Sequence, residues 1–300
     1  MVSATTSARL LNHPRAGIAF VLMAVFILTG QDAIIKWLVR DYPLLQIMFI
    51  RSVFMIVPAF ALLHAKGNLA ALKTKRPGGH LLRLVFHFFG FLGFFFALSR
   101  MPLAETMALG MTAPLFITLF SGLLLGETVR WRRWLAIFAG FAGVLIIMQP
   151  GGGPLDTLGV GAVMIFAVCY ALWTIQTRHL SSTETSDVIV FFGAAGFMIV
   201  TGFFMPFVWV EPTAFGLGLL MLLGLIATAG HYCLAQAYRH APAHVIAPFE
   251  YTGLIWAIIL GFIVFGDLPS AWMIPGAALV IGSGLYIFQR EHRVDSHVNR

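Results

Sequence analysis

The feature that most constrains this chain is a series of apolar segments, each about 20 residues long, separated by short polar links. A helix needs roughly 20 predominantly apolar residues to cross a ~30 Å hydrocarbon core. Hydrophobic residues make up 59% of the sequence and charged residues only 10%, whereas soluble domains contain roughly 45–50% and about 25%. A soluble fold cannot bury this much apolar surface, so the pattern predicts an all-α integral membrane protein.

Ten such segments are predicted, and Gly, Pro or charged residues mark most of the links between them. Their ranges are 16–38, 43–64, 81–99, 103–125, 133–149, 157–178, 187–209, 214–237, 242–265 and 270–289. No link is long enough for a soluble domain, so we expect any binding to occur inside the helix bundle. The first apolar run is too long for a signal peptide, and we expect it to remain as a membrane helix.

The Lys and Arg residues predict the orientation, because basic loops stay in the cytoplasm. With the N-terminus inside, fifteen basic residues fall on the cytoplasmic side, while Arg40 and Arg100 fall outside and Lys36 and Arg51 lie within segments. Both termini are therefore predicted to be cytoplasmic, in a bacterial inner membrane. The net charge of +7 is spread over these loops, which suits membrane orientation, and we expect no nucleic-acid partner.

The two halves of the chain are similar to each other, as a search for internal repeats shows. A shift of 140 residues aligns Pro102 with Pro242, Thr112 with Thr252, Gly90 with Gly230, and Gly126-Glu127 with Gly266-Asp267. A shift of 142 residues aligns Gly17 with Gly159 and Lys36 with Arg178. These matches predict two five-helix repeats, 16–149 and 157–289.

Because five is odd, the second repeat must enter the membrane from the opposite side. The loop charges agree, since three arginines follow Glu127 in the first repeat and none directly follow Asp267 in the second. Inverted repeats are typical of secondary transporters, whose substrate sites lie near the bilayer midplane between the halves. Membrane enzymes and channels also contain duplicated bundles and remain an alternative.

The chain resembles the EamA branch of the drug/metabolite transporter superfamily. The resemblance covers nearly the whole chain and rests on paired segments, Pro102-Leu-Ala-Glu-Thr with Ala113-Pro114 and Gly126-Glu127, and Pro242-Ala-His with Gly266-Asp267. A Gly-rich helix follows each. The resemblance implies a ten-helix basket with a central cavity, both termini in the cytoplasm, and transport without ATP hydrolysis.

The opening of the chain is similar to a subgroup that contains riboflavin importers and S-adenosylmethionine transporters. The residues concerned are Phe26 to Lys36, including Gln31-Asp32, and Gln46 to Arg51. The second repeat departs from the first here, because Thr174 stands where Asp32 stands in the first. Only one half therefore carries this charged group.

Charged residues within membrane segments are costly and usually face a cavity or a partner. Asp32 and Lys36 share one helix face and either neutralise each other or line the outer cavity and pair with substrate. Arg51 either pairs with Asp32 or Glu105, or receives an anionic or carbonyl group of the substrate. Glu105 suits the N-terminus of its helix and is expected to be structural. Glu250 is the deepest acid of the second half and is expected to stay protonated in an apolar site, to couple protons or to bind a polar ligand.

Aromatic and amide side chains are what a cavity for a flat heterocycle needs, although the same residues often serve as packing. The neutral candidates for substrate binding are His87, Tyr170, Trp173, Gln176, His231, Tyr232, Gln236 and Tyr251. The aromatic run from Phe86 to Phe96 is interpreted as lipid-facing or interhelical packing, with Gly90 and Gly93 allowing close helix approach.

No phosphate-binding loop, zinc-protease motif or nucleophile elbow occurs in the sequence, so we expect no catalytic residues, cofactor or metal. Cys169 and Cys233 lie inside apolar runs and are read as packing residues. The best hypothesis is uptake of riboflavin or a related heterocycle across the inner membrane. An exporter of amino acids or drugs, an S-adenosylmethionine transporter and, less favoured, a membrane-embedded enzyme are the alternatives. Besides a small-molecule substrate and lipid, no partner is implied, and the oligomeric state stays open.

Overall fold

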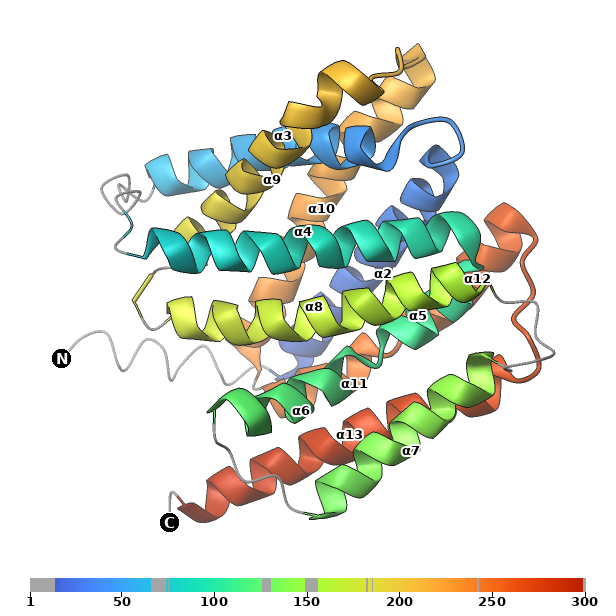
Figure 1. The fold of residues 1–300 in the computed structure, drawn as a ribbon. Coiled ribbons are helices and arrows are strands. Elements are labelled where there is room, and N and C mark those ends of the chain that lie inside the picture. The colour runs from blue at the N-terminus through green and yellow to red at the C-terminus, as the bar shows by residue number, and fades with distance from the viewer. Residues whose placement is uncertain are drawn as a thin grey trace.

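The computed structural model describes residues 14–65, 74, 76–125, 131–148, 156–181, 183–184, 186–241 and 243–298, and all regular secondary structure in them is helical (Figure 1). The first repeat contains α2 (Pro14–Leu38), α3 (Leu44–Ala65), α4 (Pro77–Arg100), α5 (Leu103–Gly110), α6 (Ala113–Leu125) and α7 (Trp131–Met148). The second contains α8 (Thr157–Ser181), α9 (Ser186–Val208), α10 (Ala214–His240), α11 (Ala243–Glu250), α12 (Gly253–Leu260), the π-helix η2 (Gly261–Phe265) and α13 (Met273–Val298).

The helix ends follow local chemistry. Pro77 occupies the first turn of α4, where its missing N–H costs nothing. The same helix ends at Met101, whose backbone is extended (ψ 158°) because Pro102 follows it. At the start of α10, Thr213 caps the helix by accepting a bond from the Gly216 amide (3.0 Å).

In the described residues, seven helices are long and apolar enough to cross a membrane. Three shorter apolar helices, Leu44–Pro58, Trp134–Met148 and Met273–Tyr286, accompany them. All ten lie within or overlap the apolar segments predicted from the sequence. The pattern is that of a multi-pass membrane protein, because lipid forces each spanning segment to satisfy its backbone within a helix.

Two predicted segments are not single α-helices, which corrects the sequence reading of 103–125 and 242–265. The first divides into α5 and α6 at Thr112, and the second divides into α11 and α12 at Thr252. Both threonines bond back to the carbonyl three residues earlier, Thr112 Oγ1 to Leu109 at 2.7 Å and Thr252 Oγ1 to Phe249 at 2.6 Å. Since the 140-residue shift relates the two positions, each repeat bends at the same place.

The contacts show that corresponding helices run in opposite directions. The start of α4 contacts the end of α8, where Gln176 Nε2 donates to the Gly79 carbonyl (3.3 Å). The end of α2 contacts the end of α4, where Lys36 bonds the Met101 carbonyl. Thus α2 is parallel to α4, α4 is antiparallel to α8, and the first helices of the two repeats are antiparallel.

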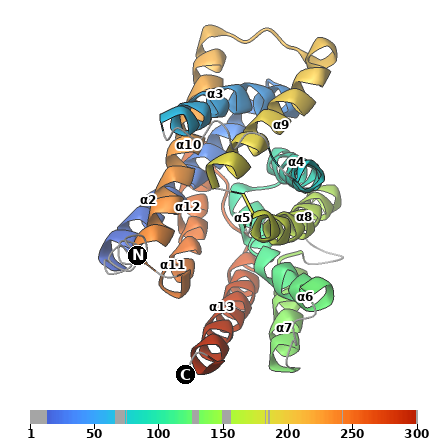
Figure 2. The same cartoon turned by 90° about the vertical axis from the view of Figure 1, so that its left-hand side faces the viewer.

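Helix packing repeats in the same way. The pair α4 and α8 corresponds to the pair α10 and α2, and both pairs pack along their lengths. The remaining large contacts join α3 with α9 and α7 with α13, and Figure 2 shows α4 beside α8 and α13 beside α7. The largest cluster of buried apolar residues takes members from both repeats, so the halves share one core.

Not all of the repeat comparison can be followed in the structure, because Gly126, Glu127 and Pro242 lie outside the described residues. Their counterpart turn is described. Gly266 adopts φ 70°, a left-handed conformation that favours glycine, and it ends η2. The turn brings Asp267 within 3.7 Å of Lys36. We call this end of the bundle the Lys36 end, and the opposite one, where α4 begins, the Pro77 end.

Candidate substrate-binding site

A buried polar group joins α2 and α3 in the first repeat. Arg51 is 6% exposed and donates through Nε and Nη2 to the side-chain oxygen of Gln31 (3.3 and 3.2 Å). Gln31 in turn donates to Asp32 (3.3 Å), which lies within electrostatic reach of Arg51. The guanidinium and the carboxylate are thus linked through an amide, in place of a direct ion pair with Asp32 or Glu105.

Aromatic rings from α4, α8 and α9 surround His87. The imidazole stacks on Trp173 with a centroid distance of 5.2 Å and an interplanar angle of 24°, and its other faces meet Phe91 and Phe197 edge-on. Tyr170 lies beside Trp173 at 5.2 Å. We call the narrow space that these rings border the aromatic crevice; it is lined by Phe86, His87, Gly90, Phe91, Phe166, Tyr170 and Trp173.

The crevice is closed in this structure, with about 0 Å³ open to a sphere the size of a water molecule, whereas typical small-molecule sites hold roughly 300 Å³ or more. A flat ligand can enter only when the rings separate. Phe86 and Phe91 line it, whereas Phe89 is 53% exposed. The aromatic run of α4 is therefore divided between the crevice, where its rings pack against those of other helices, and the outer surface.

Two ring nitrogens at the crevice have no hydrogen-bond partner among the described residues. They are His87 Nδ1 and Trp173 Nε1, and both are buried. Buried polar atoms are nearly always hydrogen-bonded in folded proteins. An indole N–H donor and an imidazole nitrogen, set beside stacked rings, can therefore recognise the polar edge of a flat molecule.

The second repeat contributes His231, Glu250 and Tyr251 to the same region. His231 Nδ1 donates to the Ala227 carbonyl (2.7 Å) and lies within electrostatic reach of Arg51 and His87. Glu250, the last residue of α11, is within reach of Tyr170 and Tyr251. His231 and Glu250 are both exposed although they interact with groups on other helices.

Tyr251 marks the second-repeat bend. It is half-buried, and its hydroxyl lies against Gly284 of α13, where any side chain would collide with it. The bend therefore places Glu250 next to Tyr251, which contacts the last helix.

Lys36 was predicted to pair with Asp32 or with substrate, but the structure gives it other partners. Its ammonium group donates to the carbonyls of Met101 (2.5 Å) and Leu98 (3.3 Å), and lies 3.7 Å from Asp267. We call these four residues the Lys36 latch. It ties α2 to the end of α4 and to the turn before α13.

Glu105 lies beside the latch and not beside Arg51. It is 2% exposed and accepts a bond from the Ser270 amide (3.0 Å). It therefore strengthens the same connection between α5 and the turn that carries Asp267, in line with its predicted structural role.

Three predicted site residues make their described contacts elsewhere. Gln176 bonds Gly79 at the Pro77 end, and Gln236 donates to Tyr232 one turn earlier on α10 (2.8 Å). Tyr232 is 56% exposed and lies on a different helix face from His231. These contacts do not connect Gln176, Tyr232 or Gln236 to the aromatic crevice.

Sequence reasoning missed Arg83 as a site residue. It is 5% exposed, donates to Thr177 Oγ1 (2.8 Å) and the Ile189 carbonyl (3.2 Å), and lies 5.1 Å above the Trp173 ring. Helix α4 begins at Pro77, so Arg83 lies about a turn and a half inside it. Its spacing of four from His87 was the signal that places both on one face.

Comparison with known proteins agrees with this architecture. The sequence profile of the EamA-like transporter family matches residues 15–149 and again residues 157–289. The chain belongs to the EamA-like transporter family. It is therefore a multi-pass membrane transporter of the bacterial inner membrane, with two EamA repeats.

Several relatives have similar length and carry the names of transporters. The riboflavin transporter of Rhizobium johnstonii is 31% identical over 93% of this chain and 90% of its own length. The S-adenosylmethionine uptake transporter of Rickettsia bellii is 26% identical over 93% and 96%. The pseudopaline exporter of Pseudomonas aeruginosa is 26% identical over 89% and 94%.

A solved crystal structure supports the fold. It has a TM-score of 0.64, 18% sequence identity, and coverage of 93% of this chain and 99% of the other. At this identity the likeness concerns the fold alone. The named relatives include an uptake transporter and an exporter, so their names do not agree on a direction of transport or on a substrate.

Proposed function

We propose that this EamA transporter is a secondary carrier that takes up a flat, polar heterocycle of the riboflavin type. The observation that carries the proposal is the aromatic crevice with its two unpartnered nitrogens on His87 and Trp173. Stacking on aromatic rings supplies contact area for a flat molecule, and the nitrogens read its polar edge. The similarity to a riboflavin transporter at 31% identity supports the same substrate class.

The polar groups around the crevice extend the site towards both repeats. Arg51 and Asp32 approach from the first repeat, and His231 and Glu250 from the second. The guanidinium can donate to a carbonyl of the ring system, while the carboxylates accept from ring or ribityl donors. In this proposal the chain has no catalytic role, because the groups are arranged to bind and not to attack.

Alternating access requires one end of the bundle to open while the other is closed. The Lys36 latch closes its end by joining α2, α4 and the turn before α13. We propose that the two repeats, 16–149 and 157–289, rock against each other and that opening the Lys36 end breaks these bonds. Binding energy from the crevice offsets their loss.

The proposed topology has ten spans, with both termini in the cytoplasm and the Lys36 end outside. The three shorter helices complete the ten, and the basic loops set the orientation. Labelling of single cysteines introduced at Arg40 and His179 of intact cells tests it. A membrane-impermeant reagent should modify position 40 and leave position 179 unmodified; the reverse result contradicts the orientation.

Uptake of S-adenosylmethionine is the second candidate function. Asp32 and Glu250 can hold a cationic sulfonium or ammonium group, and relatives at 26% identity or less carry that name. The two candidates differ in charge. A neutral flavin relies on stacking and hydrogen bonds, whereas a cation relies on the carboxylates.

Proteoliposomes that contain the purified chain distinguish these ideas. Labelled riboflavin should accumulate inside, unlabelled riboflavin should compete with it, and S-adenosylmethionine in equal excess should not. Competition by S-adenosylmethionine alone supports the second candidate. Chemical conversion of the flavin without movement would reject a carrier. Growth rescue of a bacterium that cannot make riboflavin, at low external vitamin, provides the test in cells.

A further inference from the structure

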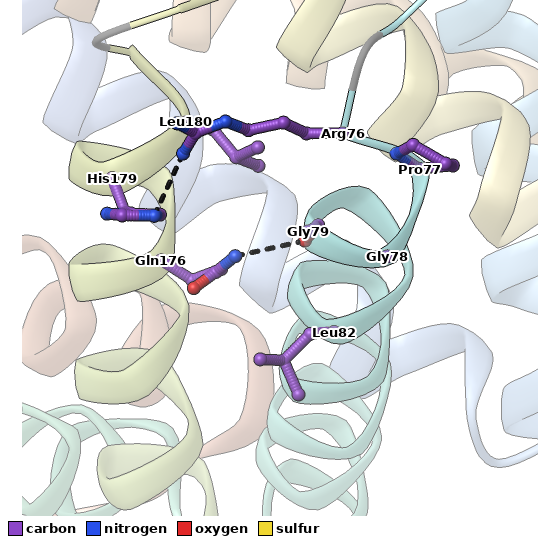
Figure 3. A pocket seen from close by; sticks show the side chains of 8 residues that line it. All are labelled: Arg76, Pro77, Gly78, Gly79, Leu82, Gln176, His179 and Leu180. Atoms are coloured by element: carbon purple, nitrogen blue, oxygen red, sulfur yellow. Dashed lines mark hydrogen bonds between the residues drawn. The ribbon is translucent and has the colours of Figure 1, made fainter.

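A second concave site lies at the Pro77 end, outside the aromatic crevice. It is a groove of about 480 Å³ between the start of α4 and the end of α8 (Figure 3). Its lining residues are Arg76, Pro77, Gly78, Gly79, Leu82, Gln176, His179 and Leu180. The proposed transport function uses none of its basic residues.

The groove is polar at its mouth and apolar below. Arg76 Nη1 donates to His179 Nε2 (2.9 Å) at the mouth, and Gln176 bonds the Gly79 carbonyl one turn deeper (3.3 Å). Figure 3 shows Arg76 and His179 above Gln176, with Leu82 further along α4. Leu82 is 46% exposed, so the lower part of the groove opens on the outer surface.

The change from polar residues at the groove mouth to apolar residues below follows the expected depth of these residues in the membrane. The candidate spans begin at Pro77 in α4 and end at Thr177 in α8. Arg76 and His179 therefore lie just outside the spans, at headgroup level, while Leu82 lies inside. The apolar side chains next to Leu82 on α4, Leu81 and Val85, are 63% and 40% exposed, as expected for a face that contacts acyl chains.

The nearby carboxylate does not line the groove. Glu184 accepts a bond from Thr74 Oγ1 (2.6 Å) and lies 4.0 Å from His80, which packs against Phe192 of α9. The groove mouth thus keeps the positive charge of Arg76. Gly78 and Gly79 have no side chains to project from α4 into the groove. A Cβ at Gly78 would meet nothing within 4 Å.

We propose that this groove binds the headgroup of an anionic phospholipid, with Arg76 and His179 at the phosphate and one acyl chain beside Leu82. Basic sites between membrane helices on the cytoplasmic side commonly hold such headgroups. The charge at the mouth selects an anion. The exposed leucine at span depth selects a lipid over a free phosphate. The bound lipid ties α4 of the first repeat to α8 of the second at the Pro77 end.

Thermal unfolding of the purified full chain in neutral detergent tests the site. Phosphatidylglycerol should raise the unfolding midpoint at lower concentration than phosphatidylcholine with the same acyl chains, and inorganic phosphate should have no effect. In Arg76→Gln the half-maximal phosphatidylglycerol concentration should rise about fivefold, since one basic group near a membrane surface contributes about 1 kcal/mol.

Gly78→Leu narrows the groove without removing charge and should weaken the lipid effect as well. The matched control is Arg100→Gln, which removes an exposed arginine from the other end of α4 and should retain the response of the unmodified chain. An unchanged phosphatidylglycerol response in both Arg76→Gln and Gly78→Leu would overturn the site. An equal response to phosphatidylcholine would overturn its selectivity for charge, and an equal response to inorganic phosphate would make it a free-anion site.

Discussion

The aromatic crevice and the Lys36 latch both bury polar groups in a membrane protein, and they differ in charge. At the latch, the Lys36 ammonium bonds two carbonyls and lies near a carboxylate. At the crevice, His87 Nδ1 and Trp173 Nε1 have no protein partner among the described residues. At the latch, Asp267 Oδ2 and the neighbouring Glu105 Oε2 also lack a hydrogen bond within the described part of the chain, but both carboxylates lie within electrostatic reach of the Lys36 ammonium group.

This difference indicates which of the two regions is the better candidate for substrate binding. Charged groups in a bilayer are costly, so a charged group that has partners on other helices stabilises that arrangement of helices. An unsatisfied donor or acceptor beside stacked rings costs free energy until a ligand supplies the bond. By this argument the latch holds a conformation and the crevice binds, and substitutions in the two regions should affect different kinetic constants.

The largest expected effect is that of Trp173→Ala on substrate binding. The change removes the ring that stacks on His87 and carries the unpartnered Nε1. Because an aromatic stack on a flat ring is worth about 1–3 kcal/mol, the KM for riboflavin uptake should rise roughly 5- to 150-fold. Trp134→Ala, at an exposed ring of α7, is the control and should leave KM unchanged. A KM that stays the same in Trp173→Ala would remove the crevice from the binding site.

Lys36→Met should act on turnover and stability without changing KM. Hydrogen bonds to charged groups contribute about 1.5–3 kcal/mol, and the variant leaves the Met101 and Leu98 carbonyls without this donor. The unfolding midpoint should fall by several degrees, and kcat should fall several-fold because one closed state is less stable. If KM rises as much as in Trp173→Ala, Lys36 contacts the substrate and the distinction between the two regions fails.

Asp267→Asn tests which partner of Lys36 matters more. The carboxylate is 30% exposed and 3.7 Å from the ammonium group, so the ion pair is worth about 0.2–1 kcal/mol. The loss in unfolding midpoint should therefore be smaller than that of Lys36→Met. A loss of equal size would show that the ion pair, and not the carbonyl bonds, closes the latch.

The smallest effect is expected at a third charged contact, where Arg100 at the end of α4 meets Asp156 before α8. Arg100 Nε donates to Asp156 (2.5 Å), and this bond holds the pKa of the Asp156 carboxyl below its ordinary value. Because the pKa of Asp156 is lower in the folded chain than in the unfolded chain, its ionisation stabilises the folded state at pH values above the unfolded-state pKa, near 4. This stabilisation is lost as the pH falls through the folded-state pKa.

The stability of the unmodified chain should thus decline slightly more between pH 5 and pH 3 than that of Asp156→Asn, when unfolding midpoints are compared in the same detergent. Because the pair is exposed, the difference should be small and should shrink in high salt. A larger acid sensitivity in Asp156→Asn would contradict the assignment.

Much of the fold was predictable because lipid imposes simple rules. Segment lengths such as 16–38 and 214–237 agree closely with α2 and α10, since each must cover the hydrocarbon core. The bends at Thr112 and Thr252 were not predicted, although the repeat comparison aligned these two residues. There the backbone N–H of Thr112 bonds the Leu109 carbonyl and that of Thr252 bonds the Phe249 carbonyl, each three residues back in place of four (both 3.1 Å). Apolar periodicity does not reveal this change.

The site was predictable only in its residue types. His87, Tyr170 and Trp173 were expected to bind substrate, and the structure brings them together with Arg83, which was counted as a loop charge. Whether Lys36 pairs with Asp32 or with Asp267 depends on the turn at Gly266, more than 200 residues away along the chain. Neither partner can be chosen from helix spacing.

By itself, the sequence determined that this protein is helical, crosses a membrane many times and consists of two related halves of opposite direction, because hydrophobic length and charge placement act locally along the chain. Only the tertiary structure decided which buried groups are hydrogen-bonded within the protein and which have no partner among the described residues. Hydrogen bonds of this kind join residues from different helices, and their geometry depends on how those helices bend and pack.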